Sequence, residues 1–442
     1  MALQRATRAV CNAHLKKSNT DIWQPFTLFA FRFSFVYLGL FCLATQIAGS
    51  LFLFPGIDFR GLGLFWPMRP ITLWVAAHIF GISEPLVFGR NSGETKFFWV
   101  QLFWLFSVAV LAASVWSILD RGRKNYVVLH KWFRLFIRFA LAASMFEYGI
   151  TKIIPIQFPR PPLNTLVTPV GNLSLSGLLW TSIGASPAYE IFTGSAEVLG
   201  GILLLIPRST TLGAMICLAD MTQVFVLNMA YDIGLKQISF HLIVLSVFLL
   251  ASDLRRLLDF FFLNREVPPS LRPQLFAGIR ANRLALVAQV IFGIYLLSMQ
   301  TYANWSYWYA AGGGSPRSPL YGIWNVDELS IDGQARPASL NDYDRRWRRV
   351  IFDSPTTVAF QRLDDSFARY NADIDVYKNT LTLTKGNSKK WKASFTFQRP
   401  SPNQLTFDGE MDGYRIHTRL ELVEFDTFRV LSSRFRWVRP DE

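Results

Sequence analysis

Seven long apolar stretches constrain the fold of this chain more than any other feature of its sequence. A helix needs about 20 mostly apolar residues to cross the roughly 30 Å of hydrocarbon in a bilayer. Stretches of this kind cover residues 26–54, 97–119, 132–154, 188–207, 211–230, 237–251 and 284–302. We therefore expect an α-helical polytopic membrane protein with about seven transmembrane helices.

The positions of the charged residues predict how these helices are oriented. The 442 residues carry a formal net charge of +14, which fits a nucleic-acid-binding protein as well as a membrane protein with basic cytoplasmic loops. The first 306 residues hold 25 basic and 13 acidic side chains, whereas the remaining residues hold 20 and 18. The excess gathers in segments 1–25, 121–124 and 252–283, on one side of a seven-helix topology. We expect these segments in the cytoplasm, the C-terminal part outside the cell inner membrane, and no nucleic-acid partner.

Three weaker segments predict helices that do not cross the bilayer. Residues 71–82 are apolar but too few to span it, and 172–184 are similar, so both are expected to be re-entrant or interfacial. Residues 253–262 are basic and amphipathic, which is typical of a helix lying on the membrane surface. Arg134 and Arg138 lie one turn apart near the cytoplasmic start of the third span, and we expect both to extend along the helix towards water.

The C-terminal part, 320–442, has the two-residue rhythm of half-buried antiparallel strands. Leu381 and Leu383 alternate with polar residues, and the Asp-Gly pairs at 408–409 and 412–413 are turn signals. About eight short strands predict an all-β domain, either a small up-and-down barrel or a sandwich. Gly322-x-Trp324 resembles the opening motif of lipocalin-like barrels. The resemblance implies a ligand-binding barrel in which Arg434 or Arg436 covers the Trp; a core filled by the domain's own aromatic side chains is the alternative.

Ionisable residues within the spans are costly in a bilayer and indicate either function or internal pairing. The third span carries Glu147 and Lys152, and Glu190 and Glu197 share one face of the fourth. The other polar positions are Asp220 on the fifth span, Asp232 and Lys236 in the next outer turn, and His241 at the start of the sixth. We expect them to line one outward-facing polar pocket. The alternative is a structural ion pair, between Lys152 and Glu190 or Glu147, that only pins the bundle.

A family resemblance appears at these residues. Residues 147–152 (EYGITK) resemble the end of the first helix in DoxX-type membrane proteins, and 197–205 (EVLGGILLL) resemble that family's Glu-x-x-Gly-Gly helix. The resemblance covers 132–251 as a four-helix core, and 210–220 are similar to the family's third helix. It implies Gly149, Lys152, Glu197, Gly200 and Gly201 as motif residues. It also implies quinone-dependent redox chemistry, because some members are membrane subunits of thiosulfate:quinone oxidoreductase.

Two functions follow as hypotheses. The first is a redox-linked membrane enzyme, or a subunit of one, that acts on a quinone or lipid substrate. Its catalytic candidates are Lys152, Glu190, Glu197 and His241. Its cofactor-binding candidates are Glu147, Gly149, Gly200, Gly201, Asp220, Asp232 and Lys236. The second is a non-enzymatic scaffold whose outer β domain binds a lipid, a small ligand or a partner protein. The scattered cysteines and histidines predict no metal site.

These predictions together divide the chain into seven parts. They are a cytoplasmic segment at 1–25, two spans with an outer loop at 26–131, the DoxX-like core at 132–251, a basic cytoplasmic segment at 252–283, a last span at 284–302, an aromatic belt and linker at 303–319, and the outer β domain at 320–442.

Overall fold

A computed structural model describes residues 22–442 apart from 55–58, 60, 89–93, 268–273, 339–341, 343–344, 387, 433–436 and 439–442. The chain forms two compact units. The first, called here the helical unit, comprises Met1–Ile154 and Ile191–Asn304. The second, called the β unit, comprises Pro155–Glu190 and Trp305–Glu442. The β unit therefore contains the loop that joins two helices of the bundle, in addition to the C-terminal part.

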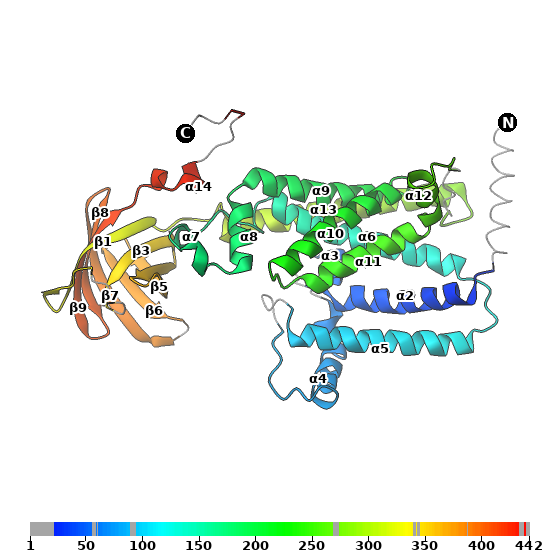
Figure 1. The fold of residues 1–442 in the computed structure, drawn as a ribbon, viewed down its shortest axis with the longest axis horizontal. Coiled ribbons are helices and arrows are strands. Elements are labelled where there is room, and N and C mark those ends of the chain that lie inside the picture. Colours follow the sequence, from blue (N-terminus) through cyan, green and yellow to red (C-terminus); the bar gives the residue numbers. More distant parts are fainter. Residues whose placement is uncertain are drawn as a thin grey trace. The chain divides into compact units, whose positions relative to one another are not determined.

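All seven predicted spans are helical (Figure 1). They correspond to α2 (Pro25–Ala44), α5 (Lys96–Leu119), α6 (Val127–Ile153), α9 (Pro187–Leu205), α10 (Thr210–Ala230), α11 (Lys236–Ala251) and α13 (Ile279–Ala311). Shorter helices are α3 (Gln46–Leu51), α4 (Met68–His78), α12 (Leu254–Phe261) and the 3-10 turn η1 (Leu62–Leu64). Helices α2 and α5 run side by side.

Five of these helices, within the part of the chain that the structure describes, are long and apolar enough to cross a membrane. The two that do not qualify on their own are α6, which carries five charged residues, and α11, which has only 16 residues. Helix α11 qualifies together with α12 as a pair bent by 83°. Apolar side chains such as Phe106, Leu111 and Val115 on α5 face outwards, as they would towards lipid. The predicted class, an α-helical membrane protein with a C-terminal β domain, is confirmed.

The first predicted span, 26–54, is wrong at its outer end. Helix α2 stops at Ala44, Thr45 is extended with φ −100° and ψ 179°, and α3 follows as a separate turn. Gly61 explains the break, since a Cβ at this position would lie 2.2 Å from the Thr45 carbonyl oxygen. Gly61 also has φ +97°, which other residues rarely adopt. The chain therefore returns against the exposed backbone of Thr45 instead of extending one long helix.

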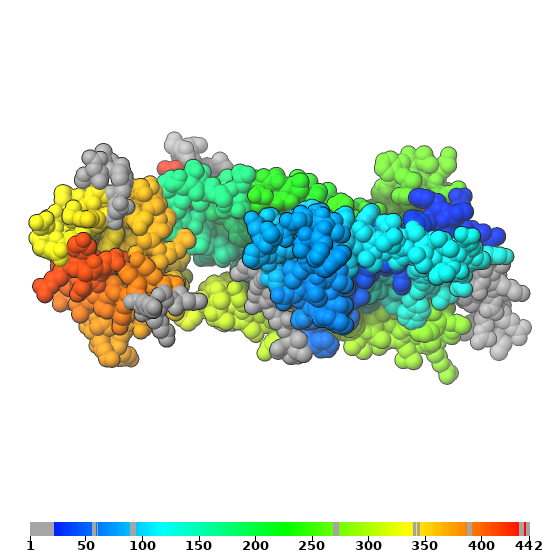
Figure 2. Space-filling view, turned by 90° about the horizontal axis from the view of Figure 1, so that it is seen from below, coloured from blue at the N-terminus to red at the C-terminus, as the bar shows by residue number. Residues whose placement is uncertain are grey.

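The short apolar segments are helical as predicted. Residues 71–82 fall mainly in α4, 253–262 in α12 and 172–184 in α8 (Leu175–Gly184), which Ser174 caps by accepting a 3.0 Å hydrogen bond from the Gly177 amide. Figure 2 shows the segment containing α4, in mid-blue, on the surface of the helical unit. Its exposed Ile71 and Trp74 fit a helix that touches lipid or its interface.

The C-terminal part is a closed barrel rather than a sandwich. Its strands are β1 (Gly322–Ile331), β3 (Trp347–Ser354), β4 (Thr357–Arg362), β5 (Phe367–Asp375), β6 (Thr380–Lys385), β7 (Ser388–Ser401), β8 (Gln404–Met411) and β9 (Tyr414–Leu422), with a two-residue strand β2 (Gln334–Ala335) beside β1. Each strand pairs antiparallel with the next, and β9 pairs with β1. Up-and-down closure leaves no long unpaired edge that could aggregate.

The two Asp-Gly signals have different outcomes. Asp412 and Gly413 both have positive φ and form the turn between β8 and β9, as predicted. Asp408 and Gly409 lie inside β8, so a turn there is wrong. A Cβ at Gly409 would lie 2.2 Å from the Ser394 carbonyl oxygen on β7, so the glycine permits close strand contact instead.

Aromatic side chains occupy the barrel interior. Trp324 has no exposed surface and joins one continuous apolar cluster with Phe352, Phe360 and Phe407. Its Nε1 donates a 2.9 Å hydrogen bond to the Leu320 carbonyl oxygen, so the buried indole is satisfied. These contacts favour the filled core over a hollow barrel.

An arginine that was not predicted lies over Trp324. The guanidinium carbon of Arg399, on β7, lies 5.7 Å from the Trp324 ring centroid. Arg434 and Arg436 lie outside the described residues.

The loop between α6 and α9 packs on the outer wall of this barrel. Leu163, at the start of α7 (Leu163–Leu166), is buried against Ile323 and Ile351, and its amide donates a 3.1 Å hydrogen bond to the Asp353 carboxylate. Burial raises the pKa of Asp353, while this bond acts in the opposite direction. The β unit also contains α8 and the short elements η2 (Val170–Asn172), η3 (Phe425–Thr427) and α14 (Arg429–Ser432).

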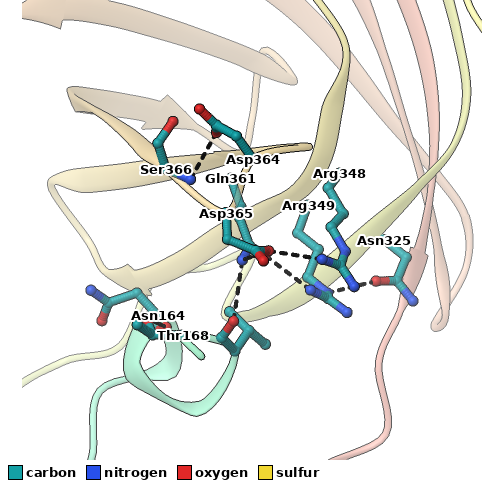
Figure 3. A network of polar contacts seen from close by, with 10 residues as sticks. Asn164, Thr168, Asn325, Arg348, Arg349, Gln361, Asp364, Asp365 and Ser366 are labelled. Carbon is teal, nitrogen blue, oxygen red and sulfur yellow. Dashed lines mark hydrogen bonds and ion pairs between the residues drawn. The ribbon is translucent and has the colours of Figure 1, made fainter. Parts of the chain in front are cut away.

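Polar contacts extend this docking along β3 and β4 (Figure 3). The Gln361 side-chain amide donates to the Val167 carbonyl oxygen at 3.1 Å and to Asp365 at 2.9 Å. Arg349 donates to the Gln361 side-chain oxygen at 3.0 Å. The loop is therefore fixed to the barrel by both apolar and polar contacts.

Replacing Trp324 by Ala should destabilise the barrel by about 3–5 kcal/mol, because a fully buried indole leaves a cavity. We expect faster amide hydrogen exchange in β1 and β9 of the full-length protein, measured by mass spectrometry. Tyr377→Ala is the control, since Tyr377 is fully exposed and its removal should change nothing. Equal exchange in the two variants would contradict the assigned core.

Candidate functional site

The central feature of the helical unit is a buried ion pair between α6 and α9. Lys152 Nζ donates to Glu197 Oε1, and the two residues are only 5% and 2% exposed. Lys152 was expected to pair with Glu190 or Glu147 if it served structure alone; its partner is Glu197. An isolated charge at this depth would be very unfavourable, so each group requires the other.

Glycines bring the backbones of α6 and α9 close enough for this pair to form. A Cβ at Gly149 would lie 2.8 Å from the Gly194 carbonyl oxygen, and one at Gly194 would lie 2.6 Å from Lys152 Cβ. A Cβ at Gly201 would lie 2.6 Å from the Phe146 ring on α6, and one at Gly200 would lie 2.9 Å from Cys217 Sγ on α10. Gly149, Gly200 and Gly201 therefore act through helix packing.

A second carboxylate lies near the pair. Asp220 on α10 interacts electrostatically with both Lys152 and Glu197. Asp220 Oδ2 and Glu197 Oε2 are buried, and neither receives a hydrogen bond from the described residues. Lys152 is thus ion-paired with Glu197, and the half-buried Asp220 lies within electrostatic range of both; each carboxylate retains one oxygen without a hydrogen bond from the described residues. We call Lys152, Glu197 and Asp220 the buried triad.

Glu147 faces a different neighbour. It accepts a hydrogen bond from the Ser50 hydroxyl on α3, and the adjacent Tyr148 hydroxyl accepts one from the Gln46 side chain. Gln46 and Ser50 were not among the predicted site residues. Two polar residues four positions apart in an otherwise apolar run would have indicated them. The short helix α3 therefore satisfies this part of α6.

Glu190 is buried but separate from the triad. Its Oε1 accepts a 2.9 Å hydrogen bond from the Phe158 amide within the β unit. Glu197 follows Glu190 by seven positions, which corresponds to a rise of about 10 Å along the α9 helix axis. A strong electrostatic interaction between the Glu190 and Glu197 carboxylates therefore does not fit this separation.

His241 bridges α2 and α11. Its Nε2 lies 2.8 Å from the Tyr37 hydroxyl, and its Nδ1 lies 2.6 Å from the Gln237 carbonyl oxygen. The ring stacks on Phe41 with centroids 3.6 Å apart. Both ring nitrogens thus have partners, and Tyr37 is a member of this site that the sequence analysis did not identify.

Asp232 and Lys236 form an ion pair with each other. Asp232 is exposed and pairs with Lys236 at 2.9 Å, one turn apart. The hydrogen bond from Lys236 lowers the pKa of Asp232. This is an ordinary surface pair at the start of α11. Among the described residues, no three His, Cys, Asp or Glu side chains are grouped to hold a metal ion.

Comparison with known proteins places the chain among relatives without an assigned activity. The uncharacterized protein YwoB of Bacillus subtilis (strain 168) is 35% identical over 147 residues, which is 33% of this chain and 92% of YwoB. The chain belongs to the YwoB family. No protein-family model and no solved structure matches it. The match to YwoB covers one third of the chain, and the resemblance to DoxX proteins stays a prediction.

Lys152→Met should lower the free energy of unfolding by about 3–5 kcal/mol, because it leaves Glu197 buried without a counter-charge. The double variant Lys152→Met/Glu197→Gln should recover most of that loss. Denaturation in mixed micelles measures both. Lys236→Met is the matched control and should cost at most about 1 kcal/mol, because its partner is exposed. A double variant as unstable as the single one would show that the pair is not the source of the effect.

Gly149→Ala should destabilise the helical unit by about 1–3 kcal/mol, because the added methyl would lie 2.6 Å from Val198 Cγ2 and push α6 from α9. The same unfolding assay applies. Gly122→Ala adds a methyl where no atom lies within 4 Å and should be neutral. If both alanines were tolerated equally, the close helix contact would not exist in the protein.

Proposed function

We propose that this protein is a redox-linked membrane enzyme, or a subunit of one, in which the buried triad handles protons for a quinone or another lipid-soluble substrate. The observation that carries the proposal is the buried Lys152–Glu197 ion pair, with Asp220 within electrostatic range of both, inside an apolar bundle. Ionisable groups at such depth are expensive and are commonly retained for function. The resemblance to DoxX proteins supplies the substrate class.

The triad has the chemistry that a carbonyl substrate requires. A quinone that accepts two electrons from a separate redox protein gains negative charge on its two carbonyl oxygens and takes up two protons there. The Lys152 ammonium can donate to such an oxygen, while Glu197 takes or gives a proton. Asp220 offers a second proton position beside the same lysine. A substrate oxygen would thus replace part of the Glu197 contact with Lys152.

The other polar residues take supporting roles in this proposal. His241 and Tyr37 form a hydrogen-bonded pair that can pass a proton, since each group both donates and accepts. Glu190 holds the Phe158 amide and so orders the start of the loop that follows α6. We place the chain in the inner membrane with its N-terminus in the cytoplasm and the substrate entering from the outer leaflet, in agreement with its basic segments.

A scaffold is the second candidate, and one contact favours it. The loop Pro155–Glu190 is fixed to the outer wall of a barrel whose interior is filled by aromatic side chains. A barrel whose core is filled by its own side chains can present its outer surface to a partner protein. In that case the Lys152–Glu197 pair would only hold α6 and α9 together.

Native mass spectrometry of the protein purified in mild detergent tests the choice. We expect the wild type to carry a quinone or similar lipid-soluble molecule, and Lys152→Met and Glu197→Gln to retain about tenfold less, because each loses a charge-assisted hydrogen bond. Lys236→Met should retain the wild-type amount. A wild type that carries a partner protein but no such molecule, with Lys152→Met unchanged, would support the scaffold instead.

A further inference from the structure

A cavity of about 500 Å³ lies in the helical unit at the end where α6, α10 and α13 begin. This is the end that the basic segments predict to be cytoplasmic, and it lies away from the buried triad. Its polar lining comes from His130, Lys131, Arg134, Arg138, Thr210, Thr211, Ser252, Asp253, Gln274, Asn282 and Gln289. The cavity therefore holds three basic side chains and one acidic one.

Arg138 does not extend to water as the sequence predicted. It is 7% exposed, and its Nη2 donates to the Gln289 side-chain oxygen on α13. Its guanidinium carbon lies 5.3 Å from the Phe139 ring centroid. A permanently charged group that is held inside the bundle and lines a cavity is placed to bind an anion there.

Arg134 lies one turn before Arg138 and completes a pair of guanidinium groups. Its Nη2 is 3.6 Å from Asp253 Oδ2, which is longer than a hydrogen bond. Asp253 has closer partners in Arg256 at 2.7 Å and the Thr211 hydroxyl at 2.9 Å. Asp253 is thus shared among Arg134, Arg256 and Thr211, so it neutralises the two cavity arginines only in part.

The start of α10 adds backbone donors to the same cavity. Ser209 precedes this helix but provides no side-chain cap, because its hydroxyl donates to the Leu203 carbonyl oxygen at 2.8 Å. Thr210 and Thr211, the first two helical residues, line the cavity. A helix start with uncapped amides carries a positive partial charge that suits phosphate.

We infer that this cavity binds a phosphate group, supplied by an anionic lipid head group or by a soluble phosphate. Two guanidinium groups and a helix start lie at this cavity, and guanidinium groups match phosphate oxygens in geometry. Leu135, Leu275 and Leu286 complete the lining and can contact acyl chains. Basic cavities between helices at the cytoplasmic face are typical sites for lipid head groups. The inference does not rest on the proposed redox function.

Ligand-dependent thermal stabilisation of the full-length protein in neutral detergent tests this site with two probes, inorganic phosphate and short-chain phosphatidylglycerol. We expect at least one probe to raise the unfolding temperature, and Arg134→Gln and Arg138→Gln each to weaken its apparent affinity about tenfold or more. Arg255→Gln is the matched control. Arg255 belongs to the same basic region, but its side chain is almost fully exposed and lies outside the cavity. That variant should bind as the wild type does.

The two probes separate the sources of the phosphate. Stabilisation by phosphatidylglycerol alone assigns a lipid head group, and stabilisation by both, with phosphate displacing the lipid, assigns a site open to soluble phosphates. Arg134→Gln keeps the test valid if Arg138→Gln does not fold, because Arg134 is partly exposed. The inference is overturned if neither probe stabilises the wild type, or if Arg255→Gln weakens binding as much as Arg134→Gln does. This assay reports phosphate binding alone, whereas the retained quinone tests the redox proposal, so failure here and failure of the redox proposal are distinguishable.

Discussion

A charge inside an apolar helix bundle is stable only if an opposite charge reaches it, and the Lys152–Glu197 pair is the contact on which the arrangement of α6 and α9 depends. The pair requires close backbones, which Gly149 and Gly194 permit. Conversely, the close backbones bury the pair so deeply that neither charge could persist alone. Packing and electrostatics are therefore interdependent here, and Asp220 adds a second carboxylate to the same balance.

The distribution of burial explains why α6 can carry so many charges. Fourteen of its 27 residues are buried, against seven of 24 in α5 and three of 33 in α13. Helix α6 thus lies inside the bundle, where neighbouring helices shield it from lipid. Its charges meet protein groups: Arg138 meets Gln289, and Lys152 meets Glu197. Helix α6 is not apolar enough to qualify as a membrane span on its own. It is also the helix that contributes to both the buried triad and the arginine-lined cavity.

The sequence predicted elements well where a single local pattern defined them. Apolar runs located the seven long helices, and the alternation around Leu381 and Leu383 located strands of the barrel. It failed where the outcome depends on distant segments. The break at Thr45 depends on Gly61, and the role of Gly409 depends on β7. The partner of Lys152 depends on how far α9 is shifted along α6, which glycine contacts define and residue spacing alone does not.

The segment that connects α6 to α9 belongs to the β unit, although both helices carry residues of the buried triad. Lys152 is the second-last residue of α6, and Glu197 lies in the middle of α9. Between them runs the loop Pro155–Glu190, closed at its base by the Phe158–Glu190 hydrogen bond and fixed to the barrel through Leu163 and Asp353. The loop packs on the outer wall of a barrel whose core is filled by its own side chains. The segment that joins the two partners of the ion pair along the chain therefore folds as part of the β unit, whereas the partners themselves belong to the helical unit.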